Sequence, residues 1–419
     1  MTSRENDATK KEASQRAKAR WSILRSALLS EATTKSNTTN KHSIHRYSFQ
    51  MLKRKIITGD DFILDRHVSD GVDMYDCVEY KVPIAGTIAK NVSIHDLFIY
   101  TKERKMNDFV TTEELMSHQK FGVDNTGNKR VWDCSNILTY LIMGSSASQP
   151  PKDYQPIIDS IKHQFSHKDP FIGLDNVLSL SQSCKYNQSK KVLKVLELGA
   201  GMAALPSLSL IALHEKNQID QNDTLPEINV TITDGHPNAV SNNLSCFHLS
   251  KSICNWNNDS NVHIQRLMWK GNDEGAKECL DMIHATSSKE RCNDHFDLCL
   301  VSDCVHFTEF HVDLSITIAR TLRIGGKCLL LQPPRGQSLQ KFLALIDAIN
   351  EGLGNGNPLF EINVHDYYSD EVYQRHCVAT KHEDYDSNIH YPVLLVLEKL
   401  REYNECLDSN SARNHCKCV

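Results

Sequence analysis

The residues best placed to do chemistry follow a short apolar run at 192–198. The run VLKVLEL reads as a buried strand, contains Glu197 near its end, and leads through Gly199 and Gly201 into a helix expected at 202–215. Two glycines allow a tight turn whose backbone can approach a ligand without a Cβ clash, and the next helix begins with unpaired N–H groups. The pattern is typical of a cofactor-binding turn, although alone it would equally suit a dinucleotide.

Two carboxylates help to distinguish the cofactors. Glu197 suits a cofactor that carries an α-ammonium and a sulfonium charge, and it would repel a pyrophosphate. Asp234 ends a second expected strand, 228–234, where its carboxylate could accept both ribose hydroxyls of an adenosine. The separation between Gly201 and Asp234 is longer than the roughly 20 residues of NAD enzymes. The pattern favours an S-adenosylmethionine-dependent methyltransferase over a nicotinamide enzyme, or over a domain whose glycines only make a turn.

A third carboxylate, Asp303, ends the expected strand 296–303, on the edge where open α/β sheets bind ligands. It could cap a helix or simply end a strand. It could also orient an acceptor amine: a lysine with a pKa of about 10.4 is only about 0.04% neutral at pH 7. A carboxylate would attract the ammonium and raise its pKa, so deprotonation would depend on the sulfonium, desolvation or water. Alignment should then supply most of the rate acceleration.

Two tryptophans have two interpretations each. Trp269 ends the expected strand 262–269, where its ring could stack on adenine or belong to the core. Trp132, in the segment 121–133, has the same ambiguity and could shield the site from solvent.

Strands and helices alternate after residue 191, which predicts an α/β fold with a doubly wound, mainly parallel sheet. Further strands are expected at 327–333, 360–367 and 391–399, with helices at 236–249, 309–323 and 337–352. The pair Gly325–Gly326 is a helix stop signal. No helix is evident between the last two strands, so the final strand should be antiparallel.

Composition excludes several classes of protein. The 419 residues are 40% hydrophobic and 24% charged, with a formal net charge of −5. A general nucleic-acid binder would show a basic excess, and no apolar stretch is long enough for a membrane span. The N-terminus lacks the apolar core of a secretory signal, so the 14 cysteines should be reduced thiols. Cys416 and Cys418 lie in an expected fraying tail.

Residues 1–15 are expected to form a disordered tail, followed by a family-specific N-terminal region at 16–120 with short strands. The main domain is expected at 121–400, with a surface insertion at about 145–191, and a flexible tail at 401–419. Residues 16–29 form a basic amphipathic helix, with Trp21, Leu24 and Leu28 on one face. This helix could pack on its own domain or contact an acidic substrate.

Several motifs occur together and in order. They are ARWSILRSAL (19–28), HRYSF (45–49), DNTGN followed by VW (124–132), LELGAGM (196–202), TDGHPNAVSNN (233–243), FDLCLVSDC (296–304), PPRG (333–336) and HYPVLLVLEK (390–399). In this combination the chain resembles the calmodulin-lysine N-methyltransferases, a family of seven-strand, class I S-adenosylmethionine-dependent enzymes. DNTGN and HYP are the most specific parts of the resemblance.

The resemblance implies a Rossmann-like seven-stranded sheet, preceded by a family-specific region. It implies methylation of a lysine of calmodulin, up to the trimethylated state, in cytoplasm and nucleus. We expect a monomer without a metal site. Carried over by position, the residues that would hold the cofactor are Glu197, Gly199, Gly201, Asp234 and Trp269, with Trp132 and the Gly127 turn nearby. Asp303 takes the acidic position of the family.

One position departs from the family pattern. Relatives often carry an aromatic residue three positions after this aspartate, where this chain has His306 followed by Phe307. The shape of the acceptor channel is therefore open. His306 could take up the leaving proton, or it could be a substitution without consequence. A methyltransferase for another protein lysine and a catalytically silent cofactor-binding protein are the alternative functions.

Overall fold

The computed structural model describes the chain from residue 48 to residue 403, with gaps. The described residues are 48–57, 75–86, 96–104, 131–150, 152, 154–158, 161, 163, 165–183, 191–219, 225–257, 261–285, 295–351, 357–383 and 385–403. The expected tail 1–15, basic helix 16–29, Gly127 turn and most of the C-terminal tail lie outside them.

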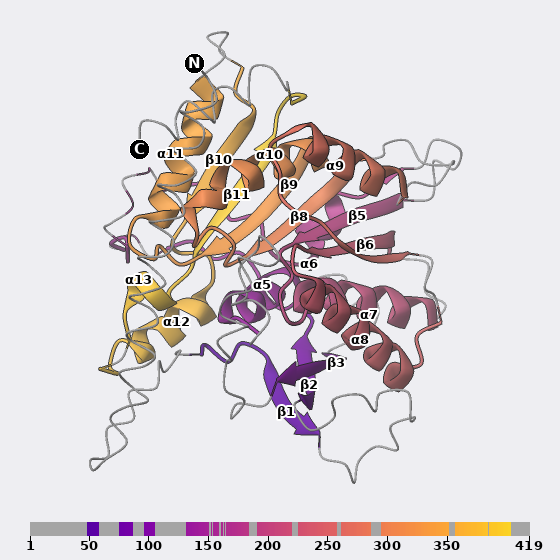
Figure 1. Ribbon diagram of the computed structural model, residues 1–419. Coiled ribbons are helices and arrows are strands. Elements are labelled where there is room, and N and C mark those ends of the chain that lie inside the picture. The colour runs from indigo at the N-terminus through magenta and orange to yellow at the C-terminus, as the bar shows by residue number, and fades with distance from the viewer. Residues whose placement is uncertain are drawn as a thin grey trace, which may run out of the picture. The chain divides into compact units, whose positions relative to one another are not determined.

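The central sheet has the expected architecture: seven strands in the order β10-β11-β9-β8-β5-β6-β7, with β4 paired to β5 beside them (Figure 1). Its strands are β4 (Gln182–Ser183), β5 (Lys191–Leu198), β6 (Glu227–Asp234), β7 (Val262–Arg266), β8 (Phe296–Ser302), β9 (Leu322–Gln332), β10 (Phe360–His365) and β11 (Val393–Lys399). From β9 to β7 the pairing is parallel, whereas β11 is antiparallel to both β9 and β10. The prediction of an antiparallel last strand is confirmed.

The order of strands creates a switch point between β5 and β8. From β5 the chain proceeds to β6 and β7 on one side, and then returns to β8 and β9 on the other side. Crossovers between parallel strands are right-handed, so the two directions place their helices on opposite faces. Open α/β sheets bind ligands at such a point, beyond the carboxyl ends of the strands. The glycine turn after β5 and Asp303 after β8 both lie there.

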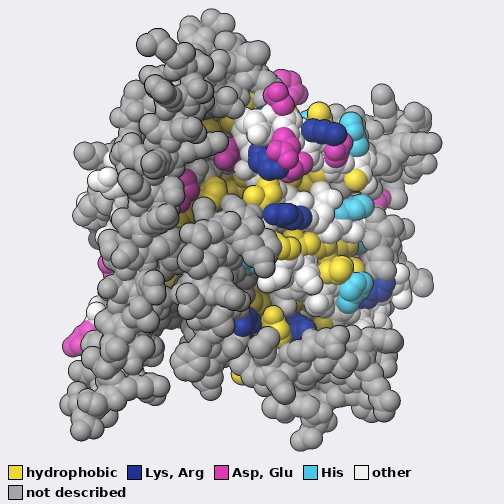
Figure 2. Space-filling view, in the orientation of Figure 1, with side chains coloured by type: hydrophobic (Ala, Val, Ile, Leu, Met, Phe, Trp, Pro, Cys, Tyr) yellow, Lys and Arg dark blue, Asp and Glu magenta, His cyan; other side chains and the backbone are white. Residues whose placement is uncertain are grey.

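Helices flank the sheet in two groups (Figure 1). One group contains α5 (Asp133–Met143), α7 (Leu205–Ile219) and α8 (Pro237–Cys254), and the other contains α9 (Asp273–Ala285), α10 (His311–Thr321) and α11 (Ser338–Glu351). On the face shown in Figure 2, acidic and basic side chains lie next to each other. Lys270, for example, pairs with Glu274 at 2.9 Å and with Glu278 at 2.6 Å. None of the described helices is long and apolar enough to cross a membrane.

A separate antiparallel sheet precedes the central one. It consists of β1 (Lys53–Ile57), β2 (Tyr75–Pro83) and β3 (Asp96–Arg104), in agreement with the short strands expected before the main domain. Two side chains of α8, eight residues apart, satisfy groups on the open edge of β3. Asn242 donates to the Lys102 carbonyl, and the Ser250 hydroxyl both accepts from the Tyr100 N–H and donates to its carbonyl. This closes an edge that would otherwise pair with another chain.

Five elements differ from the sequence-based expectation. The connection between β10 and β11 contains α12 (Asp370–Ala379) and α13 (Ser387–His390), and α9 is a further helix that was not expected. Gly325–Gly326 lies inside β9 rather than after a helix, because β9 begins at Leu322. β7 ends at Arg266, so Trp269 lies beyond the strand.

The segment 145–191 is not only a surface excursion. It contains α6 (Leu174–Ser179) and β4, and among its described residues Ile158, Ile161 and Ile172 are buried. The Asp366 carboxylate accepts hydrogen bonds from the Ile157 N–H and the Tyr154 hydroxyl. The described part of this segment therefore packs against the end of the sheet.

Candidate active site

The glycine turn is built by left-handed backbone at two positions. Gly199 has φ of 67° and Gly201 has φ of 64°, a region that residues with a Cβ adopt at a cost. The Ala200 N–H between them donates to the Thr233 carbonyl at 3.0 Å, and the Thr233 hydroxyl donates to the Glu197 carbonyl at 2.8 Å. The turn is thus fixed against the end of β6.

Asp234 holds the turn through its carboxylate. Oδ2 accepts the Gly201 N–H at 2.9 Å, and Oδ1 accepts the His236 N–H at 2.8 Å. A carboxylate has about four lone-pair positions, so two backbone donors leave acceptor capacity. The residue is partly exposed. Asp234 can therefore accept hydroxyl groups of a ligand beside the turn, as the sequence predicts.

Glu197 makes a contact with α7 that the sequence does not predict. Its side chain is buried, and Oε2 accepts the Ser207 N–H in the first turn of α7 at 3.1 Å. Burial raises the pKa of Glu197 to about 7, against the opposing effect of the Ser207 hydrogen bonds, while the nearby charge of Asp234 raises it further. The contact satisfies an otherwise unpaired N–H of a helix N-terminus. The carboxylate that the sequence assigns to a ligand cation thus binds the helix in this structure.

Trp269 lies against the glycine turn although it is outside β7. A Cβ added at Gly199 would lie 3.1 Å from the Trp269 ring and 2.6 Å from the Cys304 sulfur. The indole Nε1 is buried and has no hydrogen-bond partner. A buried donor of this kind is uncommon, because most find a partner. Trp269 therefore places an aromatic ring and an N–H donor without a hydrogen-bond partner beside the glycine turn.

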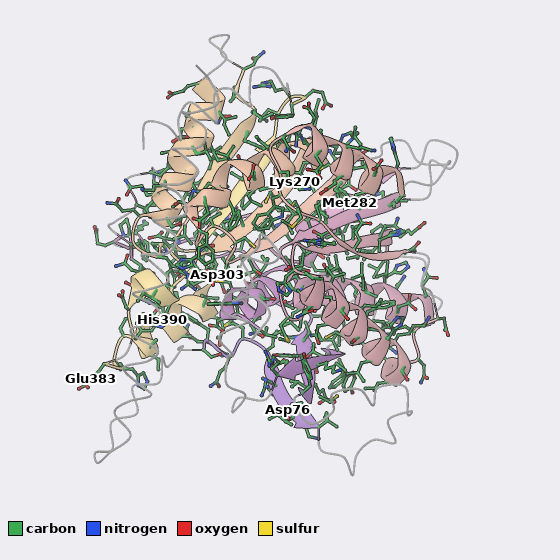
Figure 3. The ribbon with its side chains drawn as sticks, viewed as in Figure 1. Asp76, Lys270, Met282, Asp303, Glu383 and His390 are labelled. Carbon is green, nitrogen blue, oxygen red and sulfur yellow. The ribbon has the colours of Figure 1, made fainter. Side chains whose placement is uncertain are left out.

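Asp303 is paired with Arg335, a partner that the sequence does not predict. Arg335 donates through Nε to Oδ1 at 3.0 Å and through Nη2 to Oδ2 at 2.6 Å, and Gln332 Nε2 donates to Oδ1 at 2.9 Å. The side chains of Asp303 and Arg335 are 5% and 17% exposed. Burial lowers the pKa of Arg335, but the charge and hydrogen bonds of Asp303 outweigh it, and the pKa is raised overall. Figure 3 labels Asp303 near the middle of the molecule, close to α5.

Trp132 joins this pair. It is the residue before α5, and the guanidinium carbon of Arg335 lies 5.3 Å from its ring centroid, a cation–π distance. The next residue, Asp133, accepts the Phe49 N–H at 2.8 Å and the Ser48 hydroxyl at 3.1 Å. Ser48 and Phe49, the described end of the HRYSF motif, thus meet the VW and PPRG motifs at the start of α5. Trp132 reaches the site through Arg335, whereas the sequence placed it beside the cofactor.

His306 lies on the loop after Asp303. Its ring is exposed and packs edge-on against Phe307, with 4.7 Å between the centroids. Its carbonyl accepts the Ser338 hydroxyl at 3.0 Å. These contacts give the ring no defined catalytic geometry.

Sequence reasoning missed Arg335 and Gln332 as site residues. The only signal was the PPRG motif, which carried the family resemblance without indicating a contact. Both residues follow from the pairing of β8 with β9, which brings the ends of these strands together.

A family model for lysine methyltransferases matches residues 110–349, more than half of the chain. The chain belongs to the lysine methyltransferase family. Over 391 residues it is 24% identical to calmodulin-lysine N-methyltransferase of Arabidopsis thaliana, an alignment that covers 90% of this chain and 94% of that protein.

Solved structures similar to this one include other methyltransferases. A predicted O-methyltransferase from Agrobacterium tumefaciens has a TM-score of 0.30 at 12% identity, with 49% of this chain and 74% of that chain covered. An rRNA methylase from Streptococcus thermophilus has a TM-score of 0.29 at 11% identity, with 54% and 93% covered. The strand order described above, rather than these similarities, defines the fold.

S-adenosylmethionine is the methyl donor of this family, and the residues at the turn fit it. Asp234 has acceptor capacity for hydroxyl groups, Gly199 and Gly201 bring backbone close to the crevice, and Trp269 offers a ring and a buried unpaired N–H. Within the described residues, no group of three or more His, Cys, Asp or Glu side chains is placed to hold a metal ion.

Proposed function

We propose that this protein-lysine methyltransferase acts on a lysine of calmodulin and adds up to three methyl groups. The observation that carries the proposal is the alignment with the Arabidopsis thaliana calmodulin-lysine N-methyltransferase over nearly the full length of both chains. A shared glycine turn would support any methyltransferase, whereas an alignment that includes the N-terminal region supports the same substrate class.

Each site residue has a role in this proposal. When bound, S-adenosylmethionine supplies a methyl group activated by its sulfonium charge. Asp234 would accept the ribose hydroxyls, and Trp269 would pack on the adenine. Asp303 lies after β8, the strand next to β5, and its carboxylate orients the acceptor amine. Most of the acceleration comes from this alignment, because methyl transfer is an in-line displacement.

Intact-mass analysis of calmodulin tests the proposal directly. Purified enzyme, S-adenosylmethionine and unmethylated calmodulin are incubated, and the mass of calmodulin should rise in steps of one methyl, to at most three. Asp234→Ala should need a higher donor concentration for the same rate. Asp96→Ala is the matched control, because Asp96 only pairs with Lys81 on the separate three-stranded sheet. Its rate should stay at the wild-type value.

Two outcomes would contradict the proposal. Calmodulin that stays unmodified while another protein in a panel is methylated would mean a different lysine substrate. Binding of S-adenosylmethionine without turnover on any protein of the panel would indicate a catalytically silent binding protein.

A further inference from the structure

The acceptor carboxylate carries its own counter-ion. Asp303 receives two hydrogen bonds from Arg335 and one from Gln332, and both side chains of the ion pair are largely buried. The charges of Asp303 and Arg335 therefore cancel locally. Oδ2 accepts only one of the three bonds, so it keeps a lone pair for a further donor.

A bare carboxylate would work against methyl transfer to lysine. The reaction needs the neutral amine, and an opposite charge within about 4–6 Å stabilises the ammonium and raises its pKa. A site that only attracts the lysine side chain would therefore hold it in the unreactive form. A neutralised carboxylate can still accept an N–H and orient the amine.

We propose that Arg335 is a positioning residue that cancels the charge of Asp303 toward the acceptor lysine, so that Asp303 orients the amine without trapping it as an ammonium. The inference rests on the proposed lysine methylation and on the role of Asp303 in it, but not on calmodulin as the substrate.

The backbone conformations of Asp303 and Arg335 indicate that the surrounding structure fixes their ion pair. Asp303 has φ of 55° and Arg335 has φ of 45°, and such left-handed conformations are unfavourable for residues other than glycine. They persist only where the surrounding structure holds them. The Asp303 N–H donates to the Leu331 carbonyl at 3.0 Å, and the Arg335 N–H donates to the Asn388 carbonyl at 2.7 Å. Trp132 contacts the guanidinium on its ring face.

Other titratable groups face this pair. Cys134 of α5 interacts with both charges, and Cys304 follows Asp303; burial raises the pKa of both thiols well above the usual value, so both stay neutral. Asp133 lies beside Cys134, and burial raises its pKa to about 6. All three are the same in wild type and in the variants below, so a difference between their pH profiles reports the Asp303–Arg335 pair.

The pH dependence of kcat, measured with the protein substrate at saturation, tests the proposal, because kcat reports the groups that titrate in the enzyme–substrate complex. In Arg335→Gln the Asp303 carboxylate has lost its counter-ion. The acid limb of the profile, over which the rate rises with pH, should therefore move about one pH unit higher, and the rate at a fixed pH on that limb should fall roughly tenfold. Arg335→Lys keeps the positive charge and loses the two-pronged geometry. The acid limb of Arg335→Lys should therefore stay at the wild-type pH, and only the rate should fall. Asp303→Asn combined with Arg335→Gln removes both charges and should bring the limb back.

The matched control is Arg323→Gln. Arg323 makes a similar ion pair with Asp297, with side chains 14% and 6% exposed, on the same two strands. It should lower stability and leave the pH profile unchanged. An unchanged acid limb in Arg335→Gln, an equal shift in Arg323→Gln, or a higher kcat for Arg335→Gln at every pH would overturn the proposal.

A measurement without substrate separates this inference from the choice of substrate. A double-mutant cycle of Asp303→Asn and Arg335→Gln on chemical unfolding should give a coupling of about tenfold or more in the unfolding equilibrium constant. A wild-type enzyme that leaves calmodulin unmodified would refute the calmodulin proposal and leave this coupling intact. Absence of coupling would refute the inference even if calmodulin is methylated.

Discussion

Strands β8 and β9 carry two Asp–Arg ion pairs, one at each end. Asp297 and Arg323 lie near the amino ends of the two strands, and Asp303 and Arg335 lie just past their carboxyl ends. Both pairs are buried, and the shortest N–O distance is 2.6 Å in each. The same chemistry therefore occurs in two regions of one sheet.

The backbone and the neighbours differ. At the amino end, Asp297 also accepts the Lys194 N–H, and Arg323 donates to the Leu180 carbonyl, so the pair joins β8 and β9 to β5 and α6. At the carboxyl end both residues are in left-handed conformations, and an aromatic ring lies on the guanidinium. A pair that only stabilises needs no strained backbone. The left-handed backbone at the carboxyl end alone places the Asp303–Arg335 pair at the switch point of the sheet.

The largest effect is expected when the Asp303–Arg335 pair is broken. Asp303→Ala should lower kcat about 1000-fold, because the acceptor amine loses its orienting carboxylate. The affinity for S-adenosylmethionine, measured by titration calorimetry, should change by less than about threefold. A variant that lost donor binding as severely as turnover would show that Asp303 belongs to the cofactor site.

The reverse is expected at the amino end. Asp297→Ala leaves the largely buried Arg323 without its partner, which should lower the free energy of unfolding by about 3–5 kcal/mol. Urea denaturation measures this loss. For the protein that remains folded, kcat should equal the wild-type value. A specific loss of kcat would mean that the two ends do not differ in function.

Glu197 lies at the carboxyl end of β5, and the hydrogen bond described for its carboxylate joins it to the start of α7. Burial raises its pKa to about 7 from a model-compound value of 4.5, so the native state binds the proton more tightly than the unfolded state. Stability should therefore fall as the pH rises from about 4.5 to above 7, by on the order of 3 kcal/mol.

Glu197→Gln is neutral at every pH and should remove this slope, as denaturation at several pH values will show. An identical slope in the wild type and in Glu197→Gln would mean that Glu197 stays ionised in the folded protein.

The smallest expected effects distinguish backbone strain from steric crowding at Gly199 and Gly336. Gly199 and Gly336 have similar φ values, 67° and 71°, but a Cβ at Gly336 would meet nothing within 4 Å. Gly336→Ala should cost about 1 kcal/mol of stability through backbone strain alone. Gly199→Ala should cost more and weaken donor binding, because Cys304 and Trp269 must move. Equal costs in thermal unfolding would exclude crowding at the turn.

The central strands could be predicted because each is an apolar run flanked by polar residues. The helices α9 and α12 could not, since polar residues interrupt their apolar ones and only a few residues are buried. Gly325–Gly326 resembled a helix stop, but Gly325 adopts φ of 73° within β9, where the strand continues on both sides.

The site was predictable where its contacts are local. Gly199, Gly201 and Asp234 belong to motifs that imply their own geometry, and the structure brings them together. The Asp303–Arg335 pair joins residues 32 positions apart, and it depends on the pairing of β8 with β9 and on left-handed backbone that no residue type announces. The contact between Glu197 and α7 could not be predicted, because the sequence does not show which way a buried side chain turns.

A crystal structure with S-adenosylhomocysteine tests the central claim most directly. We expect the nucleoside to lie over Gly199–Gly201, with its ribose hydroxyls on Asp234 and its sulfur directed toward Asp303, which remains paired with Arg335. Electron density for the nucleoside anywhere else, or none at a concentration that saturates binding in solution, would contradict the account.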